Sequence, residues 1–446
     1  MAQNIAEITA AEMPRDDWNE IENRGTLRKA MLRLVPFLFF LYVIAYLDRV
    51  NISFAQLQMK GDLHLSDTAY GFGAGIFFPA YFLFEVPSNI ILQRVGARRW
   101  IARIMVSWGI VAMGMMFLRG AGSFYFMRFL LGIAEAGFFP GVLYYLTTWF
   151  TGAERARIVA WFMTANAAAY IVGGPISGAL LQMGGRGGLA GWQWLFLLEG
   201  MPAVIFGFVT LRYLPDSPQK ATWLTDSEKA WLLARLQTEQ EAKAASAHAT
   251  LRDALRSPRV WYLCGLFFTM TLGMYGLSLW LPQLIKELHG LSNLQVGFCS
   301  AIPYICAAVA MVLVGTRSDK TGERRLHIAI PAFLGALGLF LTARTPHNPV
   351  LGLASMSLAA AGMWSTLGPF WAISGAFLSG AAAAGGIALI NSVGNLGGFA
   401  GPYLNGYLQD RFHNSAVGLY LLAISMTMAG LLAIALPKDI AKRNDS

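Results

Sequence analysis

Twelve long apolar segments constrain the fold of this 446-residue chain more than any other feature. A helix needs ~20 residues to cross a bilayer, and only helices and closed barrels satisfy their backbone groups in lipid. The segments are too long and too uniformly apolar for barrel strands, which alternate over ~10 residues. We therefore predict an all-α integral membrane protein with transmembrane helices near residues 31–54, 70–92, 101–118, 124–149, 157–182, 192–213, 259–286, 296–315, 327–344, 349–373, 382–408 and 416–436.

The composition supports this class and excludes others. Hydrophobic residues make up 56% of the chain and charged residues 13%, whereas a soluble domain carries roughly 25% charged residues. The net charge of +9 does not indicate nucleic acid, because the basic residues lie between apolar segments. The three cysteines fall in or near such segments without metal-ligand spacing, so we expect neither a metal site nor a disulfide framework.

Lysine and arginine predict the orientation and the domain boundaries. With a cytoplasmic N-terminus, 26 of the 34 basic residues fall in cytoplasmic segments and 6 in outside loops. This asymmetry follows the positive-inside rule. We predict a cytoplasmic tail (1–30), a six-helix bundle (31–213), a cytoplasmic linker with a surface helix (214–258), a second six-helix bundle (259–436) and a cytoplasmic C-terminal tail (437–446).

The two halves repeat. The run 89–99 (NIILQRVGARR) matches 315–325 (GTRSDKTGERR) at a constant offset of 226, and the pairs Gly174-Pro175 and Gly401-Pro402 are 227 apart. Parallel repeats of six helices are a known transporter arrangement, with the substrate site near the bilayer midplane. We expect two pseudo-symmetric bundles around such a site.

Four ionisable residues lie inside predicted spans. Asp48 and Arg49 interrupt the first span, and Arg128 and Glu135 lie seven residues apart on one face of the fourth, about 10 Å along its axis. Charges in lipid are costly, so they mark a substrate or proton pathway by default. A fixed ion pair that holds the two spans together is the alternative.

The loop repeat resembles the signature of major facilitator superfamily transporters. The resemblance implies a gate at the cytoplasmic mouth. The first copy has Gln93 where the family has an acid, which weakens a charge lock there. The residues that match the gating motif are Arg94, Gly96, Arg98, Arg99, Asp319, Lys320, Gly322 and Arg325.

Further stretches look like the anion:cation symporter family over nearly the whole chain. They are 45–55 (AYLDRVNISFA), 84–89 (FEVPSN), 128–141 (RFLLGIAEAGFFPG), 192–200 (WQWLFLLEG) and 394–402 (GNLGGFAGP). Within that family the chain is most similar to bacterial tartrate, sugar-acid and aromatic-acid permeases. The resemblance implies a monomer in the bacterial inner membrane that imports a small carboxylate with protons. No cofactor is expected, because the proton gradient supplies the energy.

These inferences combine into a site hypothesis. Arg49 or Arg128 binds the substrate carboxylate, since a guanidinium can bind it bidentately. Asp48 and Glu135 carry the coupling protons. By resemblance to sugar-acid symporters, Tyr81, Asn166 and Asn391 line the site. Asn395 lies four residues from Asn391 on the same face, and either one can bind substrate while the other bridges helices.

Three alternatives remain at this point. The substrate can be an aromatic carboxylate, given the phenylalanines and tryptophans in the spans (Phe77, Phe78, Phe138, Phe139, Trp364 and Trp371), although ordinary packing also explains them. The chain can be an antiporter or efflux protein of the same fold. A membrane-embedded enzyme is disfavoured, because the sequence has no His-Glu-x-x-His, phosphate loop or metal-spaced His and Cys.

Overall fold

The computed structural model describes residues 20–245, 255–288, 290–345, 348–377 and 381–436, and every regular element in these ranges is helical. The α-helices are α2 (Glu20–Asp62), α3 (Asp67–Gly75), α4 (Phe77–Val95), α5 (Ala97–Gly114), α6 (Ala121–Glu135), α7 (Phe138–Thr147), α8 (Gly152–Leu180), α9 (Gly191–Tyr213), α10 (Asp226–Ala245), α12 (Pro258–Glu287), α13 (Asn293–Thr321), α14 (Leu326–Arg344), α15 (Pro349–Ser365), α16 (Leu367–Phe377), α17 (Ala381–Asn395), α18 (Gly397–Phe412) and α19 (Ser415–Ala435). Short 3-10 turns cover Met115–Phe117, Leu181–Met183, Arg186–Gly188 and Pro218–Lys220.

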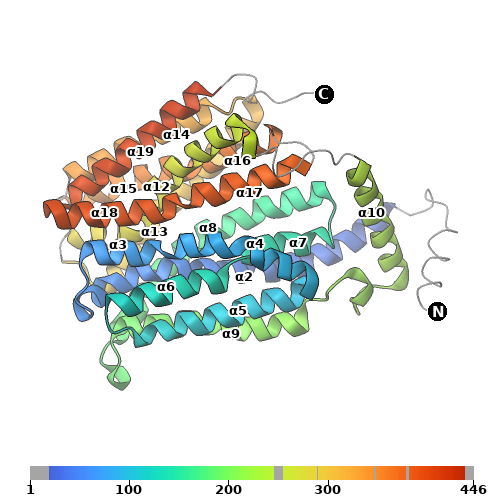
Figure 1. Cartoon of the computed structure of the whole chain (residues 1–446), viewed down its shortest axis with the longest axis horizontal. Coiled ribbons are helices and arrows are strands. Elements are labelled where there is room, and N and C mark those ends of the chain that lie inside the picture. The colour runs from blue at the N-terminus through green and yellow to red at the C-terminus, as the bar shows by residue number, and fades with distance from the viewer. Residues whose placement is uncertain (1–19, 246–254, 289, 346–347, 378–380, 437–446) are drawn as a thin grey trace.

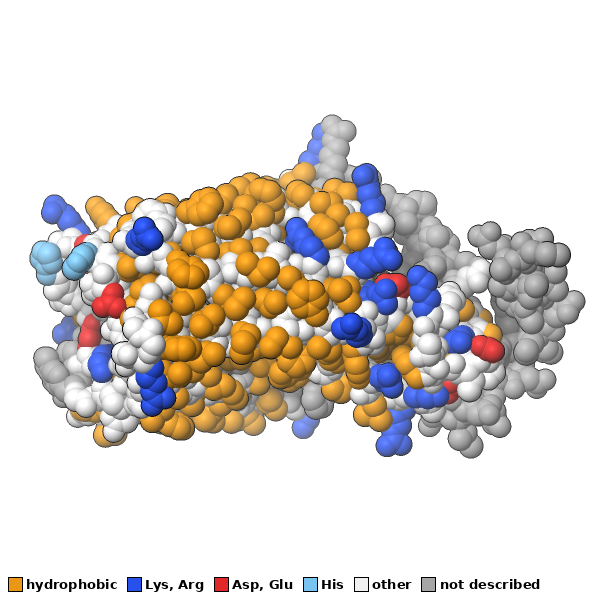
Figure 2. Space-filling view, turned by 90° about the horizontal axis from the view of Figure 1, so that it is seen from below, with side chains coloured by type: hydrophobic (Ala, Val, Ile, Leu, Met, Phe, Trp, Pro, Cys, Tyr) orange, Lys and Arg blue, Asp and Glu red, His pale blue; other side chains and the backbone are white. Residues whose placement is uncertain are grey.

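The predicted all-α membrane architecture is confirmed. Ten helical stretches in the described residues are long and apolar enough to cross a bilayer. The helix α8 and the consecutive helices α17 and α18 run alongside them and complete the twelve predicted spans (Figure 1). Figure 2 shows a broad hydrophobic band around the middle of the molecule, with charged side chains gathered toward its two ends. This is the surface that a bilayer-spanning bundle requires.

Several spans are built from two helices rather than one. The fourth span breaks between α6 and α7, where Ala136 leaves helical geometry (φ −54°, ψ 129°) and Gly137 has φ 88°. A residue without a Cβ tolerates that left-handed conformation at no steric cost. Non-helical backbone at membrane depth is tolerated where protein covers it. The break makes Glu135 the last residue of α6.

The two ends of the bundle differ. The helix α10 lies across the end at which α2 begins, which we call the linker side, and the opposite end is the far side (Figure 1). The first six spans (α2 to α9) and the last six (α12 to α19) meet most extensively where α3 packs along α18 and α8 along α13. These contacts lie toward the far side, so the described conformation is closed there.

Backbone meets backbone at this closure. A Cβ built on Gly174 of α8 would lie 2.5 Å from the carbonyl oxygen of Gly297, and one built on Gly297 would lie 2.3 Å from that of Gly174. No real Cβ fits at such distances. Small residues of this kind allow two transmembrane helices to approach closely, so both glycines are needed for the observed fit.

A polar contact, which we call the far-side latch, joins the halves at α3 and α18. The Asp410 carboxylate accepts hydrogen bonds from the backbone amides of Asp67 (3.0 Å) and Thr68 (2.7 Å), the first residues of α3. The first amides of a helix lack intrahelical partners and carry a partial positive charge. An acid of the second half therefore caps a helix of the first.

We predict that Gly297→Ala weakens the far-side closure, because the new methyl group would collide with the Gly174 carbonyl. Hydrogen–deuterium exchange followed by mass spectrometry should show faster exchange in peptides covering α3 and the far end of α18. The matched control is Gly265→Ala in α12, where a Cβ would meet nothing within 4 Å. Exchange in Gly297→Ala that equals the wild-type rate would contradict the prediction.

Candidate functional site

An ion pair in the interior of the first half joins α2 to the end of α6. The Arg49 Nε donates to Glu135 Oε1 at 2.7 Å, and Nη2 contacts the same oxygen. Glu135 is only 1% exposed. Charges at such depth persist only when they are paired and hydrogen-bonded, and this pair meets that condition.

Aromatic rings surround the Arg49 guanidinium. Its central carbon lies 5.0 Å from the ring centroid of Tyr46 and 5.3 Å from those of Phe77 and Tyr81. Rings at this distance attract a cation through their quadrupoles and replace part of its hydration. The Arg49 side chain nevertheless keeps 19% of its surface exposed, whereas Glu135 keeps 2%. The Arg49 side chain is therefore less enclosed than that of its partner.

Arg128 is more enclosed and has a different environment. It is 2% exposed, and its Nη2 donates to the Ala74 carbonyl oxygen at 2.9 Å. Its Nε finds no hydrogen-bond partner in the part of the chain that the structure describes. The Phe77 ring lies 5.2 Å from its guanidinium carbon and thus contacts both arginines. The structure gives Glu135 an ion pair with Arg49 and none with Arg128.

Asp48 faces the interior of its own half. Trp108 Nε1 of α5 donates to its Oδ2 at 2.7 Å, and Asn51 Nδ2 donates to its Oδ1 at 3.3 Å. The side chain is 2% exposed. Successive helical residues point about 100° apart, so Asp48 and Arg49 contact different elements from one turn of α2. These two neighbours in the sequence therefore have different surroundings: Asp48 is buried within its own half, and the Arg49 side chain is partly exposed.

The other predicted site residues are distributed over both halves. Tyr81 of α4 packs beside Arg49. Asn166 of α8 is partly buried, and its Oδ1 lacks a partner among the described residues. Asn391 and Asn395 lie partly buried on α17. Within the described residues no contact joins Asn391 or Asn395 to the ion pair of Arg49, so the substrate roles of these two amides stay predictions.

The first copy of the predicted gating motif lies on the linker side and is tied to its own half. Gly96 has φ 94° and makes the turn between α4 and α5. The Arg98 Nε lies 3.3 Å from Asp216 Oδ1. Arg94 and Arg99 are exposed.

The second copy is likewise tied within its half. Gly322 has φ 66° and ends α13. Asp319 accepts from Arg324 Nη1 at 2.6 Å, and Arg325 donates to the Ile434 carbonyl. Lys320 is exposed. No contact of these motif residues crosses between the halves within the described ranges.

Three aromatic residues bridge the two halves. The site hypothesis from the sequence assigned none of them a role. The Tyr170 ring of α8 stacks on Tyr304 of α13 with centroids 4.3 Å apart, and Trp364 of α15 meets Tyr170 edge-on at 5.3 Å. The sequence also did not identify Trp108 as the partner of Asp48. A buried indole N–H needs an acceptor, and a tryptophan within a predicted span was the available indication of such a bond.

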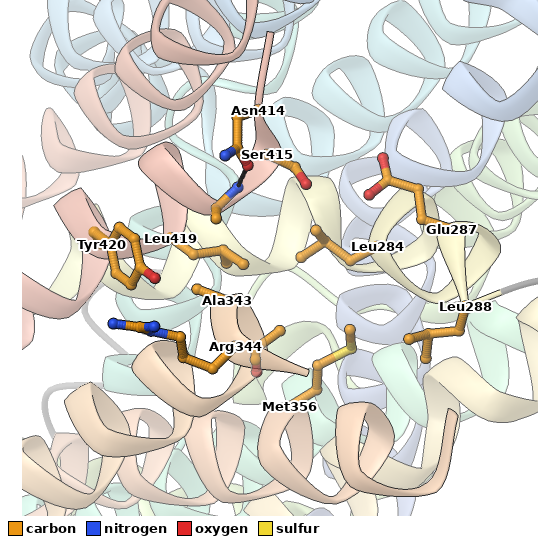
Figure 3. Close-up of a pocket in the computed structure, with 12 residues that line it drawn as sticks. Leu284, Glu287, Leu288, Ala343, Arg344, Met356, Asn414, Ser415, Leu419 and Tyr420 are labelled. Atoms are coloured by element: carbon orange, nitrogen blue, oxygen red, sulfur yellow. Dashed lines mark hydrogen bonds between the residues drawn. The ribbon is translucent and has the colours of Figure 1, made fainter. Parts of the chain in front are cut away.

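A cavity of about 550 Å³ opens at the far side of the second half and contains none of the predicted site residues. Figure 3 shows Glu287, Arg344 and Tyr420 around it. Its lining comes from the far-side ends of α12, α14, α15 and α19. The cavity lies within one half, so we do not assign the transport site to it.

A helical bundle of two packed halves with paired charges in its interior is the architecture of a multi-pass membrane transporter. The chain belongs to the Major Facilitator Superfamily, whose family model matches residues 38–402. The resemblance inferred from the loop repeat is thereby confirmed.

Similar proteins span nearly the whole chain. A "Putative tartrate transporter" of Agrobacterium vitis is 50% identical over 94% of this chain and 96% of the relative. A "Quinolone resistance transporter" of Acinetobacter baumannii is 43% identical over 92% and 94%. Among solved structures, the D-xylose-proton symporter shares the fold with a TM-score of 0.71 at 17% identity, covering 93% of this chain and 99% of that chain.

We predict that Trp108→Phe lowers the free energy of unfolding by about 1–3 kcal/mol, because Asp48 loses a donor while it stays buried. Denaturant titration in detergent micelles measures this. Trp194→Phe is the control, since the exposed Trp194 indole donates only to the Arg186 carbonyl. The effect should shrink in an Asp48→Leu background, which has no acceptor for the indole N–H. An equal loss in both backgrounds would show that packing, not the hydrogen bond, is responsible.

Proposed function

We propose that the protein is a secondary active transporter that imports a small hydroxylated carboxylate, tartrate or a sugar acid, together with protons. The observation that carries this proposal is the ion pair between Arg49 and Glu135, whose cationic partner remains accessible. Two relatives at 50% and 48% identity are named as putative tartrate transporters. They support a dicarboxylate as the substrate class.

The ion pair supplies a coupling mechanism by competition. Glu135 and a substrate carboxylate are alternative anions for the Arg49 guanidinium. Protonation of Glu135 removes its charge and frees the guanidinium, which then holds the substrate bidentately. Loading either one alone leaves an uncompensated charge in the interior, which is strongly unfavourable. Proton and substrate therefore bind together.

We assign the substrate carboxylate to Arg49 in preference to Arg128. Arg128 is 2% exposed and already donates to the Ala74 carbonyl, whereas Arg49 keeps a reachable surface. Asp48 is the second proton-carrying candidate. Its carboxylate accepts a hydrogen bond from Trp108, and we assign it no direct contact with the substrate.

Import is our proposed direction. The charge asymmetry of the sequence supports a cytoplasmic linker side and cytoplasmic termini. The far side would then be external, and an importer would reach the described conformation after substrate had entered from outside. Rocking of the two halves about the central site would complete transport.

Export in exchange for protons is the second candidate. The observation that favours it is the relative named as a quinolone resistance transporter. The same ion pair would serve either direction, because competition for Arg49 is symmetric across the membrane. The response to an imposed pH gradient separates the two.

We predict that Glu135→Gln abolishes accumulation driven by a proton gradient yet preserves exchange of labelled for unlabelled substrate. A neutral amide no longer gains and loses a proton, but it leaves Arg49 free. Uptake of labelled tartrate into proteoliposomes with an inward proton gradient measures this. Glu228→Gln on α10, whose carboxylate pairs with Lys29 at the surface, is the control. Accumulation that survives Glu135→Gln, or that never depended on the gradient, would refute proton coupling through this residue.

We predict that Arg49→Lys weakens tartrate binding by at least about tenfold, because a point charge replaces a fork that holds a carboxylate through two bonds. Isothermal titration of the purified protein measures the dissociation constant. Arg103→Lys, at the linker-side end of α5 beside Trp100, is the control. An unchanged affinity in Arg49→Lys would assign the carboxylate to another cation.

A further inference from the structure

Tyr275 is a residue of the second half whose hydroxyl has no assigned role. It lies on α12, and its ring packs against Phe78 of the first half with centroids 4.5 Å apart. The side chain is only partly buried. Its hydroxyl makes no hydrogen bond to any residue that the structure describes. The hydroxyl is not among the fully buried unpaired atoms of the described residues, so water or a ligand can reach it.

The surroundings of this hydroxyl are those of the proposed substrate site. The Phe78 ring that Tyr275 contacts lies 5.3 Å from the Phe77 ring, and the Phe77 ring lies 5.3 Å from the Arg49 guanidinium carbon. The helix α12 also packs against α2, which carries Arg49. Tyr275 is thus a phenol contributed by the second half to an ion pair that belongs to the first.

Tyr81 presents a matching group from the first half. Its ring lies 5.3 Å from the Arg49 guanidinium carbon, and its hydroxyl likewise has no hydrogen-bond partner in the described ranges. Unpaired polar groups in an apolar interior are unfavourable unless a ligand or water satisfies them. Two such hydroxyls near one accessible guanidinium complement a carboxylate whose adjacent carbons carry hydroxyl groups.

We propose that Tyr275 is a specificity-determining residue that hydrogen-bonds a substrate hydroxyl while Arg49 holds the carboxylate. This inference rests on the proposed function and deepens it, because it selects hydroxylated over plain dicarboxylates. A site built to pair a substrate hydroxyl discriminates strongly against the analogue that lacks it. Since Tyr275 and Arg49 belong to different halves, the ligand also links the two halves, and binding depends on their approach.

The test compares L-tartrate with succinate, which has the same carbon chain and carboxylates but no hydroxyls. Dissociation constants are measured by titration of the purified full-length protein. Tyr275→Phe keeps the ring against Phe78 and removes only the unpaired hydroxyl. We expect about fivefold weaker tartrate binding, the loss of one hydrogen bond, with succinate binding unchanged. Tyr81→Phe should act in the same direction.

Tyr420→Phe is the matched control, since it removes a phenol from the far-side cavity of the same half (Figure 3). A ratio of tartrate to succinate affinity as large in Tyr275→Phe as in the wild type would overturn this proposal alone. Equal weakening for both acids would also overturn it, because the ring and not the hydroxyl would then matter. Wild-type protein that binds neither of these acids nor any sugar acid would overturn the proposed function, and this inference with it.

Discussion

The buried pair of Arg49 and Glu135 is the constraint on which the rest of the interior depends. Removing one partner of such a pair leaves an uncompensated charge and costs about 3–5 kcal/mol. The surrounding structure stabilises both partners of the pair. The fourth span ends its first helix at Glu135, and the rings of Tyr46, Phe77 and Tyr81 replace the lost hydration of the guanidinium. The same arrangement makes the pair separable, because Arg49 keeps an accessible face.

The architecture was predictable because hydropathy and segment length report directly on the bilayer. The twelve spans and the repeat of 89–99 in 315–325 needed no knowledge of tertiary contacts. The breaks within spans were less accessible. Gly137 takes a left-handed conformation, but the chain has 47 glycines, and most of them lie in helices or serve close packing. Composition alone does not distinguish these uses.

The site could be predicted in part. Asp48, Arg49, Arg128 and Glu135 were identified because a charged side chain within an apolar span is energetically costly and therefore indicates a function. Their partners could not be read from the sequence. Seven residues along a helix leave about 10 Å between Arg128 and Glu135, whereas the Arg49 side chain reaches Glu135 from α2. Trp108 donates to Asp48 from another helix, and no local spacing indicates that bond.

The far-side latch has a consequence for how such a carrier can diversify. Asp410 accepts hydrogen bonds from the main-chain amides of Asp67 and Thr68 at the start of α3, and the side chains of Ser66 and Thr68 also act on it. The two amide donors are present for every amino acid except proline at positions 67 and 68. Most substitutions at these two positions therefore keep the main-chain part of the far-side latch, whereas the loss of Asp410 removes all of it. The proposed substrate site in the interior and the far-side latch use different residues, so substrate preference could change without altering the contact that closes the far side.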